Sequence, residues 1–222
     1  MSPILLILAL DPTAAKAVEY LAEHVPRWPR ENGCFSCHHN GDGARALLAA
    51  RRRGYRVPEE ALRETLNWLA HPERWDQSAK HPQASDKKLA RIQFAVAARE
   101  AGLQRDMIGE RPDDTPGGPI TWGKELATAL IEKRRPPAPA RQNPDGGWGS
   151  RNGTPSEAFD TAVALLAIDD NAATARGRAY LARTQTEDGS WSETTRPPGA
   201  SSYAHRVSTT AWALLALLHT EN

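Results

Sequence analysis

Cysteine is scarce in this chain, since Cys34 and Cys37 are the only two in 222 residues. Without a second cysteine pair a structural zinc site is disfavoured, because such a site usually takes four ligands and histidines would have to supply the rest. The two cysteines are therefore interpreted first as one local motif.

An excess of charge of either sign is also missing, and so is a long apolar run. The formal net charge is +1, which gives no argument for nucleic acid or an anionic membrane as a partner. No apolar run reaches the roughly 18 residues that a membrane span requires. We therefore expect neither nucleic-acid binding nor a membrane span.

The patterns typical of β-strands are almost absent. Alternating β-branched runs do not occur, whereas alanine and leucine recur at helical spacing. Asp86 and Ser156 are expected N-caps, and Gly54 and Gly102 are expected helix ends. The sequence predicts an all-α fold with helices over residues 12–25, 43–54, 58–71, 86–102, 120–133, 156–168, 172–184 and 206–219.

The two cysteines belong to the segment Cys34-Phe35-Ser36-Cys37-His38. Cys-x-x-Cys-His is the pattern that attaches a c-type haem: two thiols bond to the porphyrin vinyl groups, and the histidine ligates the iron from one face. The pattern predicts haem c at Cys34, Cys37 and His38. A dithiol or disulfide pair, a zinc site completed by nearby histidines, and an inert pair stay open as alternatives.

The second ligand of such an iron cannot be chosen from the sequence. His39 adjoins His38 and is disfavoured for that reason, whereas Met107 stands where a distal methionine could lie. Five-coordinate iron would permit small-ligand chemistry, and six-coordinate iron would favour electron transfer. The candidates are His24, His39, His71, His81 and Met107.

The first 11 residues include an apolar run, 4–10, that resembles the central part of a secretory signal lacking its basic start. Export to the periplasm would suit haem attachment and equally a disulfide. We expect an exported protein, with a cytoplasmic one as the alternative. Residues 12–222 are predicted to form a single domain, with Pro/Gly-rich connections at 103–119 and 134–155.

The chain also repeats itself. Residues 142–148 and 185–191 both have the form Gln-x3-Gly-x-Trp, and each is followed by a turn-rich stretch and an Ala/Leu helix. We expect the Gln amide to bond backbone groups at a helix end, the Gly to take a positive φ and the Trp to cover a neighbouring helix. In a fainter copy at the start of the chain, Cys-x-x-Cys-His takes the place of Gly-x-Trp.

These repeats resemble those of squalene–hopene cyclases and protein prenyltransferases, closely over 142–218 and weakly over 12–102. The resemblance implies an α/α toroid with inner and outer helices around a central cavity. Because the predicted helices are too few for a full ring, it implies a partial or distorted toroid, whose open apolar edge would favour a homodimer. The arrangement also resembles a bacterial group in which such repeats follow a Gly-Cys-x-x-Cys-His segment.

Cyclases of this kind protonate an alkene with the middle aspartate of an Asp-x-Asp-Asp-Thr-Ala motif. Phe159 stands at that position here, which argues against cyclase chemistry, and no cysteine beyond Cys37 exists for a prenyltransferase zinc site. Glu157 and Asp160 lie three residues apart and are either an acid–base pair or, as we expect, acidic residues favoured at a helix N-terminus.

Tyr203 and His205 precede the last helix, where the loops of a toroid line the mouth of its cavity. Both side chains are candidates for binding a polar ligand or donating protons. The alternative, which we prefer, is that they cap the helix and form surface hydrogen bonds.

These observations favour a non-cyclase repeat protein that carries haem c in a redox or ligand-binding role. Its partner would be a redox protein or a small molecule. One alternative is an enzyme similar to terpene cyclases or prenyltransferases, with Cys34 and Cys37 as a disulfide. The other is a degenerate toroid that acts as an interaction module.

Overall fold

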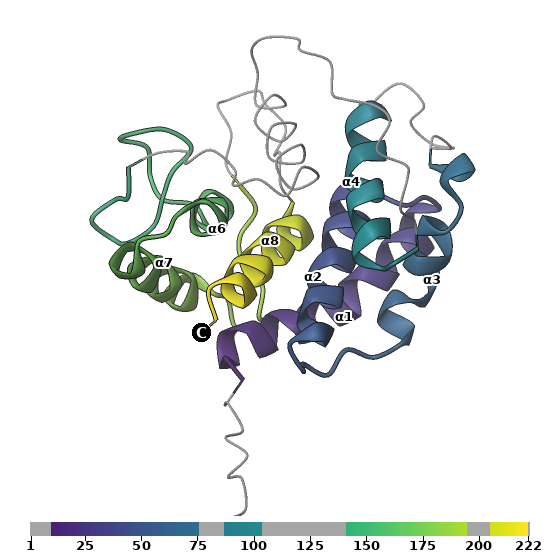
Figure 1. Cartoon of the computed structure of the whole chain (residues 1–222), viewed down its shortest axis with the longest axis horizontal. Coiled ribbons are helices and arrows are strands. Elements are labelled where there is room, and N and C mark those ends of the chain that lie inside the picture. The colour runs from purple at the N-terminus through teal and green to yellow at the C-terminus, as the bar shows by residue number, and fades with distance from the viewer. Residues whose placement is uncertain (1–9, 76–86, 104–140, 195–204, 222) are drawn as a thin grey trace, which may run out of the picture.

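The computed structural model describes residues 10–75, 87–103, 141–194 and 205–221 (Figure 1). In these ranges the chain is all-α, with seven α-helices and no β-strand, as the sequence predicts. The expected helix over 120–133 lies outside the described residues, as do Asp86, His81, Met107 and Tyr203.

Apart from the end of α1, the described helices agree closely with the predicted ranges. A π-helical turn, η1 (Cys37–Gly41), leads directly into α2, and a 3₁₀ turn, η2 (Pro72–Arg74), follows α3. The α-helices are α1 (Pro12–Asn32), α2 (Asp42–Arg52), α3 (Glu60–Leu69), α4 (Lys87–Glu100), α6 (Ala158–Ala167), α7 (Asn171–Thr184) and α8 (Arg206–His219).

Helix α1 runs well past its predicted end and passes through Pro26 and Pro29. Each proline removes one backbone donor from the helix. Tertiary packing outweighs that loss, because Val25 and Pro26 are buried. The helix ends instead at Gly33, whose left-handed backbone lets its N–H bond the Pro29 carbonyl at 2.9 Å.

Two of the expected helix ends are confirmed and one expected cap is wrong. Gly54 and Gly102 follow α2 and α4 with positive φ values of 87° and 72°. Ser156 does not cap α6, because Glu157 occupies the N-cap position and the Ser156 hydroxyl donates to Asp145 Oδ1 at 2.8 Å instead.

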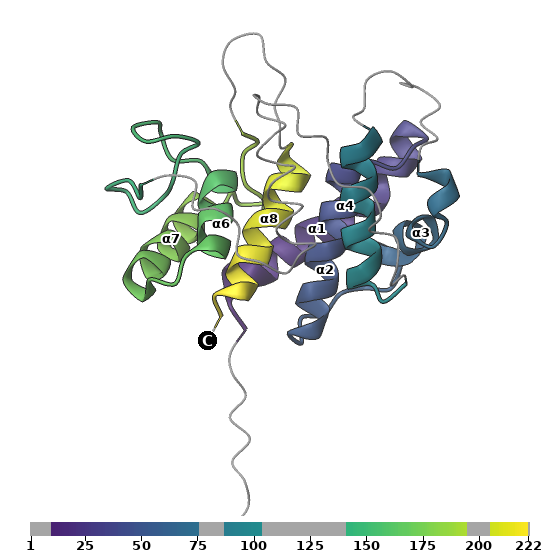
Figure 2. The ribbon, with the colours of Figure 1, turned by 45° about the horizontal axis from the view of Figure 1, so that its top comes forward.

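The helices pack in two rows (Figures 1 and 2). In one row α6, α8, α2 and α4 follow one another, each in contact with the next. In the other row, α7 lies against α6, α1 against α8 and α2, and α3 against α1, α2 and α4. The last helix of the chain therefore lies in the middle of its row, and the first helix lies beside it.

The two Gln-x3-Gly-x-Trp loops dock in the same way on different helices. Gln142 Nε2 donates to the carbonyl of Ala173 in the first turn of α7 at 2.9 Å, and Gln185 Nε2 donates to that of Thr13 in the first turn of α1 at 2.9 Å. Gly146 and Gly189 both take the expected positive φ. Helix α1 therefore accepts the second loop in the same way as α7 accepts the first.

The tryptophans of both loops are core residues. Trp191 is fully buried, and its indole N–H donates to the Leu181 carbonyl at 2.9 Å. Trp148 packs so closely on α7 that a Cβ added at Gly177 would lie 2.9 Å from its ring.

None of the described helices is both long and apolar enough to cross a membrane.

Gly189 gives a test of how the two ends of the chain join. A Cβ at Gly189 (φ +84°) would lie 2.4 Å from the Lys16 carbonyl oxygen of α1, whereas one at Gly153 (φ +81°) meets nothing within 4 Å. We expect Gly153→Ala to lower the free energy of unfolding by about 1 kcal/mol, the cost of the backbone conformation alone. Gly189→Ala should cost about 2–4 kcal/mol because a backbone clash adds to it.

Chemical denaturation of the two variants measures the difference. Equal losses in both would mean that the Gly189 loop does not press on α1.

Candidate cofactor-binding site

The cysteine motif leads into a π-helical turn that is anchored to two helices. The N–H groups of Asn40 and Gly41 both donate to the Ser36 carbonyl, at 2.8 and 3.2 Å. The fully buried Asn40 side chain donates to the Val25 carbonyl of α1 and to Thr65 Oγ1 of α3, each at 3.1 Å. The turn is thus fixed in place by buried hydrogen bonds.

Two adjacent histidines lie in this turn, and burial keeps both neutral. Burial lowers the pKa of His38, the charge of Asp42 opposes that shift, and the charge of His205 adds to it. The pKa of His39 falls to about 3, chiefly through burial. His39 stacks on Trp28 with ring centroids 3.7 Å apart, and its Nδ1 lies 3.2 Å from Ser36 Oγ. A neutral imidazole is the form that ligates a metal.

Asp42 begins α2 one turn after His38 and is completely buried. Its Oδ2 accepts hydrogen bonds from Ser208 Oγ at 2.8 Å and from Trp212 Nε1 at 3.0 Å, both on α8. Its Oδ1 lies 3.6 Å from Arg45 Nη1. Burial raises the pKa of Asp42, and the charge of Arg45 opposes this.

Aromatic rings surround the same segment. Phe35 stacks on Trp68 at 4.7 Å between centroids, and Trp68 meets Phe94 edge-on at 6.2 Å. The buried indole nitrogens of Trp28 and Trp68 have no hydrogen-bond partner in the described part of the chain. Buried N–H donors are normally paired, so two unpaired ones beside one motif indicate a place for an acceptor.

Cys34 is half-buried. The Cys37 side chain, and with it the predicted pairing or haem attachment of Cys37, lies outside the described residues. Among the side chains that are described, no three His, Cys, Asp or Glu come together closely enough to hold a metal ion.

His205 lies beside the cysteine motif, which its sequence position did not indicate. Its ring centroid is 5.5 Å from that of His39. His205 occupies the N-cap position of α8, but its side chain forms no capping hydrogen bond, so the expected capping role is wrong. Its Nδ1 lies 3.6 Å from the Glu193 carboxylate.

The acidic pair considered in the sequence analysis lies on a different helix from the cysteine motif. Glu157 and Asp160 lie at the start of α6, and Asp160 is buried in its first turn. Phe159 is buried and meets Trp212 edge-on at 5.9 Å. The same tryptophan donates to Asp42, so α8 connects this face of α6 to the cysteine motif.

Two of the predicted distal histidines are held by their own helices. His24 stacks on Tyr20 at 4.0 Å, and its Nδ1 lies 3.0 Å from the Tyr20 carbonyl oxygen. His71 follows α3, with Nδ1 2.7 Å from the Asn67 carbonyl oxygen.

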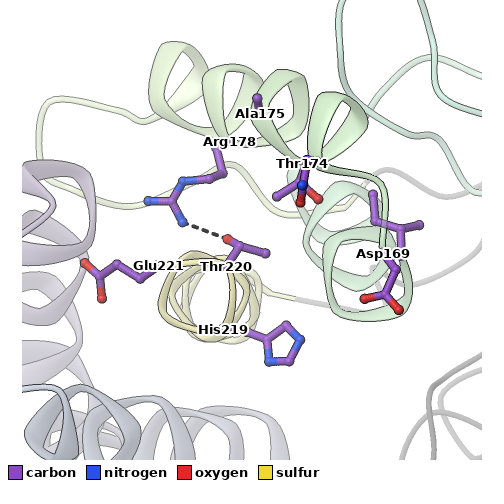
Figure 3. Close-up of a pocket in the computed structure, with 9 residues that line it drawn as sticks. Asp169, Thr174, Ala175, Arg178, His219, Thr220 and Glu221 are labelled. Carbon is purple, nitrogen blue, oxygen red and sulfur yellow. Dashed lines mark hydrogen bonds between the residues drawn. The ribbon is translucent and has the colours of Figure 1, made fainter.

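A pocket of about 380 Å³ opens between α7 and the end of α8 (Figure 3). Arg178 from α7 points into it and donates to Thr220 Oγ1 at 2.7 Å and to the Leu217 carbonyl at 2.6 Å. The same guanidinium pairs with Asp11, the N-cap of α1. This cation therefore ties the two ends of the chain together.

No protein-family model matches the sequence, and no curated protein is similar enough to count as a match.

Asp42 gives a test of the packing around the site. Asp42→Asn leaves the Arg45 charge buried without a counter-charge, so we expect the free energy of unfolding to fall by about 3–5 kcal/mol. Glu23→Gln removes an exposed ion pair with Arg27 and should cost roughly 0.5 kcal/mol or less. Urea denaturation of both variants compares them, and similar losses would contradict a structural role for the buried carboxylate.

Proposed function

We propose that the protein carries a covalently bound haem c, attached at Cys34 and Cys37 and ligated by His38, in a redox or ligand-binding role. When bound, haem supplies one-electron chemistry or an iron site for a small ligand. The observation that carries the proposal is the setting of the motif: burial favours the neutral form of His38, and the buried indole N–H groups of Trp28 and Trp68 have no partner among the described residues.

The residues fit the group. Burial favours the neutral form of His38, which can bind iron without first losing a proton. Phe35, Trp68 and Phe94 give the surroundings a low polarity, which suits a porphyrin ring. The indole N–H groups of Trp28 and Trp68 could donate hydrogen bonds to the carboxylate groups of a haem.

Asp42 supports His38 electrostatically. Its charge raises the pKa of His38 against the effect of burial. Outer carboxylates commonly orient a ligating imidazole and increase its basicity. Ser208 and Trp212 fix the position of Asp42, so α8 contributes to the site from the other end of the chain.

We also propose that the two rows of helices belong to a partial α/α toroid. The support is the alternation of the rows and the equivalent docking of the two Gln-x3-Gly-x-Trp loops on α7 and on α1. In this arrangement α1 and α8 form one helical pair although they lie at opposite ends of the chain. Export, which haem c attachment favours, and a homodimer remain predictions.

The test is to produce the protein with a haem c maturation system, denature it and extract it with acidified acetone. We expect a Soret band that stays with the polypeptide, because thioether bonds survive the extraction. The double variant Cys34→Ala/Cys37→Ala should lose the band entirely. His219→Ala, which removes an exposed histidine at the end of α8, should keep it.

A colourless wild-type protein would contradict the proposal. Thiol titration and metal analysis would then show whether Cys34 and Cys37 form a disulfide or bind zinc.

A further inference from the structure

Helix α8 brings an imidazole to the cysteine motif from far along the chain. The rings of His205 and His39 stack with centroids 5.5 Å apart, and α8 contacts the turn η1 that holds His38.

Buried hydrogen bonds fix the position of His205 relative to the turn. Ser208 and Trp212 bind the carboxylate of Asp42, one turn after His38. The N–H of Thr209 donates to the His205 carbonyl at 2.8 Å, which makes His205 the start of the helix. The backbone of His205 is therefore held near His38 by the α2–α8 interface.

The side chain of His205 does not cap α8, and its described contacts are with the His39 ring and the Glu193 carboxylate. Ser, Thr, Asp or Asn normally caps a helix at this position, yet this imidazole makes no capping bond and is half exposed. Its Nδ1 lies 3.6 Å from the Glu193 carboxylate. Because Nδ1 faces this carboxylate, at an ion-pair distance that is too long for a hydrogen bond, we assign Nε2 as the ring nitrogen that would bind a ligand.

The other described histidines are held in different surroundings. His39 is fixed between Trp28 and Ser36 and is adjacent to His38. His24 stacks on Tyr20, and His71 lies at the end of α3.

We infer that His205 would supply the second protein ligand to the haem iron, in addition to His38. The inference rests on the proposed haem c function. It specifies six-coordinate iron with two imidazole ligands, which favours electron transfer over the binding of small ligands and gives a lower reduction potential than a His/Met pair.

The experiment uses the haem-loaded protein and records its visible and electron paramagnetic resonance spectra. We expect low-spin iron with two imidazoles in the wild type. His205→Ala should become high-spin and bind carbon monoxide in the reduced state, and added imidazole should restore the low-spin spectrum. His205→Met should stay six-coordinate with a higher reduction potential.

His219→Ala, at the other end of the same helix, is the matched control and should leave the spectrum unchanged. Circular dichroism and extraction-resistant haem content of each variant separate loss of a ligand from loss of folding or attachment.

Three results would overturn the inference: high-spin iron in the wild type, a low-spin two-imidazole spectrum that survives in His205→Ala, or a change to high spin in His24→Ala alone. In each of these results the haem is attached, so the proposed function stands. A wild type without covalent haem would overturn both.

Discussion

The packing of the helices depends on the hydrogen bonds and the ion pair of one buried carboxylate, that of Asp42. A charge without access to water is costly, so Asp42 needs Arg45, Ser208 and Trp212 together. Two of these partners lie on the last helix, whereas Asp42 begins the second. Because this carboxylate needs hydrogen-bond donors from α8, it fixes how α8 packs against α2.

That packing determines what surrounds the cysteine motif. Helix α8 is in contact with both α2 and α1, so its first turn is held beside the π-helical turn. His205 and His39 meet there because of this packing, and Trp28 closes the other side of His39. The surroundings of the cysteine motif are thus built by the first, second and last helices, although the two cysteines lie only three residues apart in the sequence.

The repeats explain how distant ends of a chain form one unit. Each Gln-x3-Gly-x-Trp loop needs a neighbouring helix. A carbonyl in the first turn of that helix accepts a hydrogen bond from the Gln amide, and the helix backbone lies close against the Gly of the loop. Helix α7 does this for the first loop. Helix α1 does this for the second loop, although it lies far from that loop in the sequence. Arg178, paired with Asp11 and bonded to Thr220, reinforces the same junction.

The sequence alone determined the helical class, most helix boundaries, the positive φ of Gly146 and Gly189 and the motif at residues 34–38, because these depend on local periodicity and short spacing. It did not reveal that α1 continues through Pro26 and Pro29, where burial outweighs the lost backbone bonds. Only the tertiary structure decided that Asp42 is a buried centre and that His205 meets His39. Both depend on contacts between helices more than 160 residues apart, which no local pattern records.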